Sequence, residues 1–174
     1  MGRIRQMIAV DGRECWTLFD SGARNTYVIP AVADLLKTFS LKGLDGKTLS
    51  AEDLKGKVAV INVWGVWCSP CVKEMPQIQK LYDKYKADAH IAIVTIDSGD
   101  GTGILKSFLA GNKYTFPVLL ESEYFPKSEV TAYPTTWFID REGKIAFTKV
   151  GRTIDLENEF EWRIQALLEQ KENK

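Results

Sequence analysis

Cys68 and Cys71 are the residues of this sequence whose types and spacing could do chemistry most directly. A thiolate attacks a disulfide through a mixed-disulfide intermediate, and a second thiol close by can then release the partner by closing an internal disulfide. Cys68 lies nearer the expected start of a helix, so we expect it to be the exposed nucleophile, with Cys71 as the resolving thiol. The pair predicts thiol–disulfide exchange with a substrate.

The pair stands between a strand pattern and a helix pattern. The segment 58–63 is an apolar run broken only by Asn62, which is typical of a strand covered on both faces. After the pair, apolar residues recur at helical spacing: Cys71, Met75, Ile78, Tyr82 and Tyr85. The first turn of a helix favours a thiolate, and the pKa of a cysteine placed there can fall from about 8.5 to roughly 3.5 to 7.5.

Three other interpretations of the pair are open. Half of a zinc site is one, but a closed site needs about four ligands, and only Cys15 and His90 remain to supply the others. A purely structural disulfide is the second, although so short a loop removes little chain entropy. Two buried, unpaired cysteines are the third. The sequence favours the reactive pair, and we expect no metal.

The motif resembles the active site of the thioredoxin superfamily, and more narrowly that of the TlpA/ResA-like thiol–disulfide oxidoreductases. It reads Trp67-Cys68-Ser69-Pro70-Cys71, followed by Glu74 and Pro76. The resemblance covers residues 39 to about 168 and continues in an opening hairpin (39–47), a second active-site segment (133–140) and a closing hairpin (141–145). It implies a thioredoxin-like α/β fold, with a central mixed β-sheet flanked by helices. It also implies an oxidoreductase with no cofactor beyond a redox-active Cys68–Cys71 disulfide.

The resemblance assigns further site residues. It implies a cis Tyr133–Pro134 bond beside the cysteines, which leaves the Tyr133 backbone free to pair with an extended substrate chain. The Tyr133 side chain either narrows access to Cys68 or stacks on a substrate, and both alternatives stay open. Trp64 and Trp67 are expected to shape the surface around the disulfide, with Trp67 as a substrate contact.

Glu74 lies one helical turn after Cys71, where the TlpA/ResA-like group places a carboxylate. Thioredoxin instead carries a buried acid at the position of Asn62. If Glu74 is desolvated, its pKa is raised, and it could accept a proton from Cys71 as that thiol attacks. The alternative is a solvated glutamate paired with a lysine such as Lys73.

Composition limits the partners. The 23 basic residues balance the 23 acidic ones, and no basic stripe points to nucleic acid or an anionic membrane. No run of about 18 apolar residues predicts a membrane span. Residues 1–10 do not resemble a signal peptide. As the sequence is written, a cytoplasmic location is therefore predicted. If a leader was removed, the protein is instead expected in the periplasm or elsewhere outside the cytoplasm. The unpaired Cys15 is mild evidence for a reducing compartment.

Residues 1–38 are expected to be an N-terminal extension of a thioredoxin-like domain at 39–174. A hairpin is predicted at 4–19 across Asp11-Gly12, and a short helix at 30–37. Asp20-Ser21-Gly22-Ala23 resembles the active-site loop of retroviral-type aspartic proteases, but the scaffold and the paired aspartate of such a protease are missing. The extension is therefore expected to pack on the domain or to mediate self-association.

Within the domain, periodicity predicts the remaining elements. They are a capped turn at 50–54, parallel strands at 58–63 and 90–96, a helix at 104–110 ended by Gly111-Asn112, a strand at 115–120, a hairpin of 137–139 with 145–150, and a last helix with an apolar stripe of Leu156, Phe160, Ile164 and Leu167.

Two rival functions remain. A peroxiredoxin-like thiol peroxidase shares this fold, but its usual Pro-x-x-x-Thr-x-x-Cys context is absent. A non-catalytic binding module would use the N-terminal extension for partner contact. The favoured oxidoreductase needs protein thiols or disulfides as substrates and an upstream electron donor.

Overall fold

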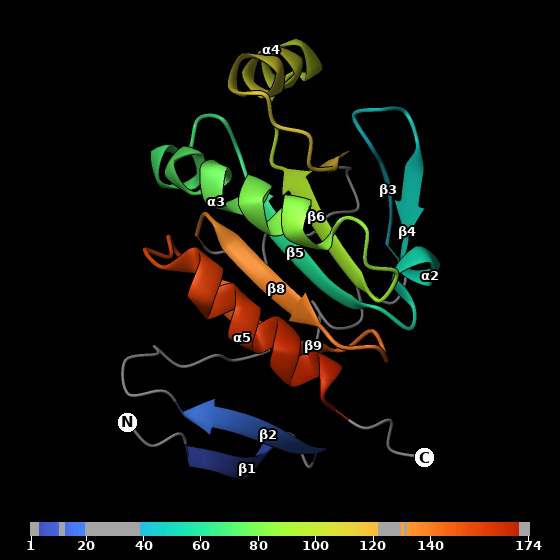
Figure 1. Cartoon of the computed structure of the whole chain (residues 1–174), viewed down its shortest axis with the longest axis vertical. Helices are drawn as coiled ribbons and strands as arrows, with labels where there is room; N and C mark the ends of the chain where they lie inside the picture. Colours follow the sequence, from blue (N-terminus) through green and yellow to red (C-terminus); the bar gives the residue numbers. More distant parts are fainter. Residues whose placement is uncertain (1–3, 11–12, 20–38, 122–129, 131, 171–174) are drawn as a thin grey trace.

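The computed structural model describes residues 4–10, 13–19, 39–121, 130 and 132–170, and for the first two of these ranges the backbone only. A five-stranded mixed sheet in the order β7-β6-β5-β8-β9 forms the centre of the fold (Figure 1). Its strands are β5 (Val58–Trp64), β6 (Ile91–Asp97), β7 (Val118–Leu120), β8 (Thr135–Ile139) and β9 (Ile145–Val150). β5, β6 and β7 are parallel, whereas β8 and β9 run antiparallel to their neighbours.

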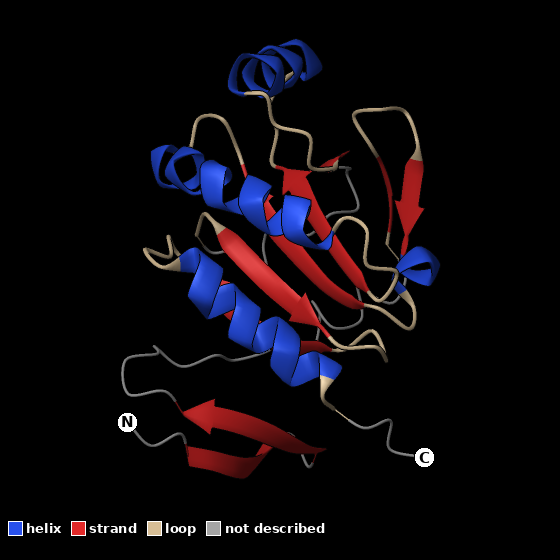
Figure 2. Ribbon diagram, viewed as in Figure 1, coloured by secondary structure: helices blue, strands red, loops and turns tan. Residues whose placement is uncertain are grey.

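Helices cover one face of the sheet. α3 (Ser69–Tyr85) and α5 (Leu156–Leu168) lie side by side on it, and α4 (Thr102–Asn112) lies on the side of α3 away from α5 (Figure 2). Alternate residues of β5, namely Val58, Val60 and Trp64, pack in the core on this face. All seven β5 side chains are buried, as expected for a central parallel strand.

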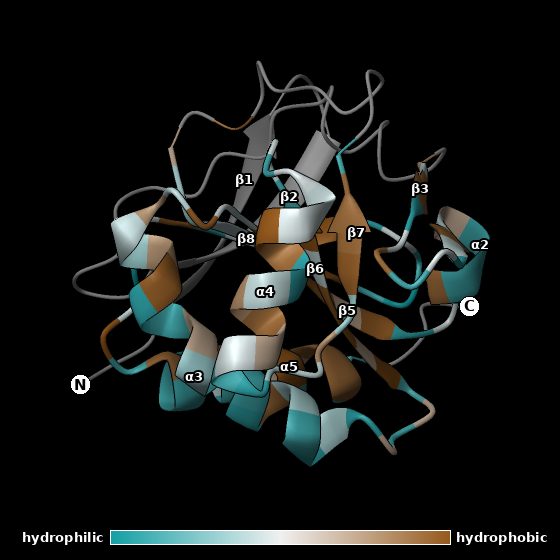
Figure 3. Ribbon diagram, turned by 90° about the horizontal axis from the view of Figure 1, so that it is seen from above, coloured by the Kyte–Doolittle hydropathy of each residue, from teal (hydrophilic) through white to brown (hydrophobic). Residues whose placement is uncertain are grey.

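The opposite face of the sheet has a second core cluster. Ala59, Ile61 and Val63 of β5 contribute to it. A small hairpin of β3 (Ser40–Lys42) and β4 (Thr48–Ser50) adds Leu41, and the single turn α2 (Ala51–Leu54) adds Leu54. Both faces of the central strands are therefore apolar. Figure 3 shows hydrophobic residues of β5 and β7 in brown.

Most of the predicted elements are confirmed. β5 and β6 are parallel, and β8 and β9 form the closing hairpin. The turn α2 is held by a capping box between Ser50 and Asp53. The apolar stripe of α5 is buried throughout. In the extension, β1 (Ile4–Val10) pairs antiparallel with β2 (Arg13–Phe19), as expected for a hairpin. The predicted helix at 30–37 and the protease-like segment at Asp20 lie outside the described residues.

Several predicted boundaries are wrong: α4 begins at Thr102 instead of 104, β8 begins at Thr135 instead of 137, and two further boundaries differ for a clear physical reason. α4 continues through Gly111 and Asn112 and ends at Lys113, which takes the left-handed conformation with φ of 59° and donates its N–H to Ala110 and Leu109. β7 begins at Val118 rather than at Thr115. Pro117 has no N–H to donate to a neighbouring strand, and the Thr115 N–H instead donates to Gln79 Oε1 of α3 at 2.7 Å.

Candidate active site

The two cysteines lie at the junction between β5 and α3. Cys68 is the N-cap of α3, Pro70 occupies the first helical turn, and the Cys68 Sγ accepts the Cys71 N–H at 3.3 Å. The pair forms a disulfide with its Cα atoms 5.2 Å apart. The geometry allows the pair to open and close by thiol exchange at the positive end of the helix dipole.

The prediction of an exposed Cys68 is wrong for the disulfide form. Cys68 is 5% exposed and Cys71 fully buried. Both side chains belong to the core cluster under α3. Cys68 nevertheless keeps the larger exposed fraction, so any attack from solvent reaches it first.

Two aromatic side chains lie next to each other at the site. The Trp67 side chain is 58% exposed, and its ring centroid lies 4.9 Å from that of Tyr133 in an edge-on arrangement. The Tyr133–Pro134 peptide bond is cis, and Pro134 is buried. Trp67 and Tyr133 thus form an aromatic pair, and Tyr133 packs against the core cluster containing Cys68. The Tyr133 ring is already occupied by an intramolecular partner.

Gly65 makes the position of Trp67 possible. A Cβ atom on Gly65 would lie 2.4 Å from the Trp67 Nε1 atom, well inside van der Waals contact. Any side chain at this position would displace the indole. This requirement was not recognised in the sequence, because a glycine after a strand is also an ordinary turn residue.

Trp64 does not shape the surface, contrary to the prediction. Its side chain is fully buried and lies against Phe108 of α4 and against Phe116, with ring centroids 5.6 Å and 6.2 Å away. The reason is register. Trp64 is the last residue of β5 and points to the helix-covered face, whereas Trp67 follows in the loop.

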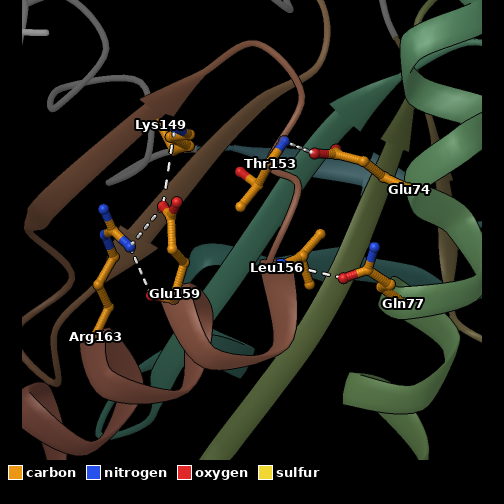
Figure 4. Close-up of polar contacts among 7 residues, drawn as sticks. All are labelled: Glu74, Gln77, Lys149, Thr153, Leu156, Glu159 and Arg163. Atoms are coloured by element: carbon orange, nitrogen blue, oxygen red, sulfur yellow. Dashed lines mark hydrogen bonds and ion pairs between the residues drawn. The ribbon is translucent and has the colours of Figure 1, made fainter. Parts of the chain in front are cut away.

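Glu74 is buried, and the solvated alternative with Lys73 is wrong. Its side chain is 1% exposed, and Oε1 accepts the backbone N–H of Thr153, which lies just before α5 (Figure 4). Within the described part of the chain, Oε2 has no hydrogen-bond partner. Desolvation raises the pKa of Glu74 to about 7, although the Thr153 N–H and the charges of Arg152 and Lys149 oppose this shift.

Glu74 lies on the same face of α3 as Cys71, one turn along the helix. A carboxyl group that titrates near neutral pH can both accept and return a proton there. Asn62 cannot do so. It is buried in β5 and donates from Nδ2 to Thr136 Oγ1 at 2.9 Å.

α3 and α5 are tied together beside Glu74. Gln77 Oε1 accepts the Leu156 N–H at 3.1 Å (Figure 4). Glu159 of α5 forms ion pairs with Lys149, at 3.8 Å, and with Arg163, at 3.4 Å. These contacts fix the segment that carries the Thr153 N–H, and through it the position of the Glu74 carboxylate.

The loop after β6 supplies functional candidates that were not recognised in the sequence. Asp97 is 2% exposed, and Asp100 Oδ2 accepts the Val66 N–H at 2.5 Å. Ser98 contacts both aromatic residues: its carbonyl accepts the Trp67 indole N–H at 3.1 Å, and its hydroxyl lies 2.7 Å from the Tyr133 hydroxyl. In the sequence, this segment is a glycine-rich loop with no recognisable site pattern.

The remaining candidates lie elsewhere or outside the described side chains. His90 is exposed at the end of the loop before β6. Cys15 lies on β2, of which only the backbone is described. In the described part of the chain, no group of three or more histidine, cysteine, aspartate or glutamate side chains could hold a metal ion. None of the described helices is long and apolar enough to cross a membrane.

Comparison with protein families and curated proteins gives consistent matches. Residues 32–148 match the model of the AhpC/TSA family. A thiol-disulfide oxidoreductase ResA from Bacillus cereus is 35% identical over 115 residues, which are 65% of this chain and 66% of the relative. The sporulation thiol-disulfide oxidoreductase A of Bacillus subtilis is 32% identical and covers 71% of this chain and 73% of its own length. The chain spans just under two thirds of the ResA relatives' length.

Solved structures share the fold. A protein from Chlorobium tepidum described as a putative thiol:disulfide interchange protein DsbE superposes with a TM-score of 0.67 and 29% identity. The match covers 75% of this chain and 93% of that protein. The central sheet and the helices on it are thus parts of a fold that this chain shares with that protein.

Proposed function

The chain belongs to the AhpC/TSA family, and from this premise we propose that it is a thiol–disulfide oxidoreductase that exchanges a disulfide with protein substrates. The observation that carries the proposal is the Cys68–Cys71 disulfide at the N-terminus of α3. The relatives named above are themselves described as thiol-disulfide oxidoreductases or interchange proteins, which supports the same reaction here.

In the proposed reduction, the Cys68 thiolate attacks one sulfur of a substrate disulfide. The other substrate sulfur leaves as a thiolate and takes a proton from solvent. The Cys71 sulfur then attacks Cys68 Sγ, which closes the Cys68–Cys71 disulfide and releases the second substrate thiolate. Two electrons pass from the dithiol to the substrate.

Glu74 is the proposed acceptor of the Cys71 proton. Its carboxylate is buried one turn along α3, and its raised pKa of about 7 matches it to proton transfer near neutral pH. When the reaction runs in the opposite direction, the same carboxyl returns the proton to Cys71. The residue would thus assist the resolving step and not the first attack.

Trp67, Tyr133 and Pro134 are the proposed substrate contacts. Trp67 offers exposed apolar surface beside Cys68. The Tyr133 side chain is held against Trp67, so that the backbone on its other side is left for an extended substrate segment. Large apolar side chains with a polar edge are common anchors in protein recognition.

The proposed cycle needs an electron donor, because each turnover leaves the Cys68–Cys71 disulfide behind. A dithiol-containing protein could act as this donor, and no further cofactor takes part in the exchange. Self-association through residues 1–38 stays a prediction, and sedimentation of the full chain beside a chain lacking residues 1–38 would test it.

An insulin-reduction assay with dithiothreitol as the donor tests the proposal. The full chain should accelerate precipitation of the insulin B chain, Cys68→Ser should abolish the acceleration, and the matched control Cys15→Ser should retain it. Turnover no faster than buffer would instead indicate a binding module. Thiol-dependent consumption of hydrogen peroxide without insulin reduction would indicate a peroxidase.

A further inference from the structure

The loop from Asp97 to Asp100 touches the dithiol site at three points. Asp100 accepts the N–H of Val66, two residues before Cys68. The Ser98 carbonyl accepts the indole N–H of Trp67, and the Ser98 hydroxyl is hydrogen-bonded to Tyr133. One short loop therefore holds both the backbone that leads into Cys68 and the two aromatic side chains of the proposed substrate surface.

Two carboxyl groups set the shape of this loop. Asp97 is the last residue of β6 and is paired in register with Trp64, the last residue of β5. Its Oδ2 atom accepts the Asp100 N–H at 2.9 Å. Asp97 therefore lies directly against Asp100. Two ionised carboxylates held so close together out of water repel each other, and a single proton on the pair relieves this repulsion.

The surroundings favour that proton. Asp97 is 2% exposed, and in the described part of the chain its Oδ1 atom meets no N–H or hydroxyl donor. Desolvation, followed by the contact with Asp100, raises the pKa of Asp97 to about 7, and the charge of Glu121 adds to the shift.

The neighbouring elements contribute the following groups. Glu121 follows β7 and accepts a hydrogen bond from the Ser98 hydroxyl at 3.3 Å. The hydroxyl of Tyr133 comes from the segment before β8. From β5, the neighbour of Asp97 is the uncharged Trp64. Among these described neighbours, the charged one is Glu121, whose negative charge raises the pKa of Asp97 further.

We propose that Asp97 and Asp100 are a positioning pair for the dithiol site, in which one shared proton keeps Asp100 against the Val66 N–H and Ser98 against Trp67 and Tyr133. Loss of the proton leaves two adjacent carboxylates with Glu121 close by. Their repulsion separates Asp97 from Asp100 and releases the loop. Neither residue touches the reacting sulfurs. Both act through the backbone of Val66 and through Ser98.

The consequence for exchange rests on the proposed function. When the pair loses its proton, Trp67 and Tyr133 are no longer held together, and a protein substrate meets a less ordered surface. The effect should appear in KM for a protein disulfide rather than in the rate of attack on a small disulfide. Glu74 has a separate role, because it acts on the Cys71 proton and lies on α3, one turn after Cys71.

A nuclear magnetic resonance titration of the oxidised full chain tests the structural step. Cys68 and Cys71 do not titrate while they form a disulfide, so the amide of Val66 and the indole N–H of Trp67 report on the loop. Both signals should shift between pH 5 and pH 9 with one shared midpoint near neutral pH. Asp97→Asn, which can still bond to Asp100 but cannot ionise, should hold both signals at their low-pH positions.

Glu74→Gln is the matched control, because Glu74 titrates in the same range, and it should leave the shared midpoint in place. A Val66 amide that does not respond to pH in the unmodified chain would overturn the proposal, as would a midpoint that survives in Asp97→Asn. Asp100→Asn provides a second variant in case Asp97→Asn does not fold, and it should also remove the midpoint.

A kinetic measurement then tests the consequence. The quantity to compare is kcat/KM for insulin of the unmodified chain divided by that of Asp97→Asn. Both proteins contain Cys68 and Glu74, so the effects of their titration cancel in this ratio. This ratio should fall at least about threefold between pH 6 and pH 8.5, through KM, and a constant ratio would contradict the positioning role. A chain that reduces no insulin at any pH would refute the proposed function. The magnetic resonance titration would still show whether Asp97 and Asp100 hold one proton between them.

Discussion

Glu74 on α3 accepts a hydrogen bond from the backbone N–H of Thr153, a residue 79 positions later in the chain. The contact joins the helix that carries the dithiol to the segment that enters α5. It also means that a buried carboxyl group is held one turn from Cys71 by a neutral donor. A neutral donor offsets only part of the desolvation, and the pKa of Glu74 therefore stays high.

We expect Glu74 to make the stability of the protein depend on pH. Because its pKa rises from 4.5 to about 7 on folding, burial favours the protonated form. Its contribution is fully present below about pH 4.5 and is lost as the pH rises through about 7. The free energy of unfolding of the unmodified chain, relative to Glu74→Gln, should fall by up to about 3 kcal/mol over this range. Urea unfolding at several pH values measures it.

The contribution of Asp97 is the same in both proteins of that comparison, so it cancels in the difference. A difference that does not change with pH would show that Glu74 has an ordinary pKa in the folded protein.

The roles of the two cysteines can be separated by trapping. In Cys71→Ser, the mixed disulfide between Cys68 and a substrate cannot be resolved, so it should accumulate as a species sensitive to reductant. Cys68→Ser should trap far less, because Cys71 is fully buried. Gel electrophoresis without reductant after incubation with oxidised insulin shows both. Equal trapping by the two variants would contradict the assigned roles.

The two tryptophans near the motif should differ sharply on substitution. Trp64→Ala removes a fully buried ring from the core and should lower the free energy of unfolding by about 3 to 5 kcal/mol. Trp67→Ala removes a mostly exposed ring and its contact with Tyr133, so the loss should be about 1 kcal/mol. Instead, it should raise KM for insulin. Similar destabilisation by both variants would mean that Trp67 is not a surface residue.

Gly65→Ala should disturb substrate recognition more than folding. The added Cβ would lie 2.4 Å from the Trp67 Nε1 atom and would push the indole away from the Ser98 carbonyl. We expect a several-fold rise in KM for insulin, which corresponds to about 1 kcal/mol, and a changed Trp67 indole signal. Gly46→Ser, in the distant β3–β4 turn, is a control for general loop strain, because the φ of Gly46 is 86° and no atom lies within 4 Å of its Cβ position. Equal KM values in the two variants would contradict the role of Gly65.

Sequence patterns predicted the frame of this molecule well because its elements follow simple periods. The apolar run of β5 predicted a buried strand, and the apolar stripe of α5 predicted a helix with one buried face. The end of α4 was harder to predict. Gly111 is compatible with a helix interior, and only the left-handed Lys113 ends it. The side of the sheet that Trp64 faces depends on register, which the sequence leaves open.

In the candidate site, too, the local features were predicted and those that depend on distant parts of the chain were not. The dithiol motif is local, so its residues identify it. The burial of Glu74 depends on Thr153, and the grouping of Asp97, Ser98 and Asp100 with Val66 and Tyr133 depends on contacts over more than 30 positions. Such contacts arise from the topology of the sheet, and a single sequence gives no direct sign of them.

The most direct test of the account is the pH dependence of alkylation of Cys68 in the reduced full chain, measured with iodoacetamide and mass spectrometry. A thiolate at the N-terminus of α3 should react with a midpoint well below the value of about 8.5 for a free cysteine. A midpoint at or above 8.5 would contradict the claim that the helix end activates Cys68 for exchange.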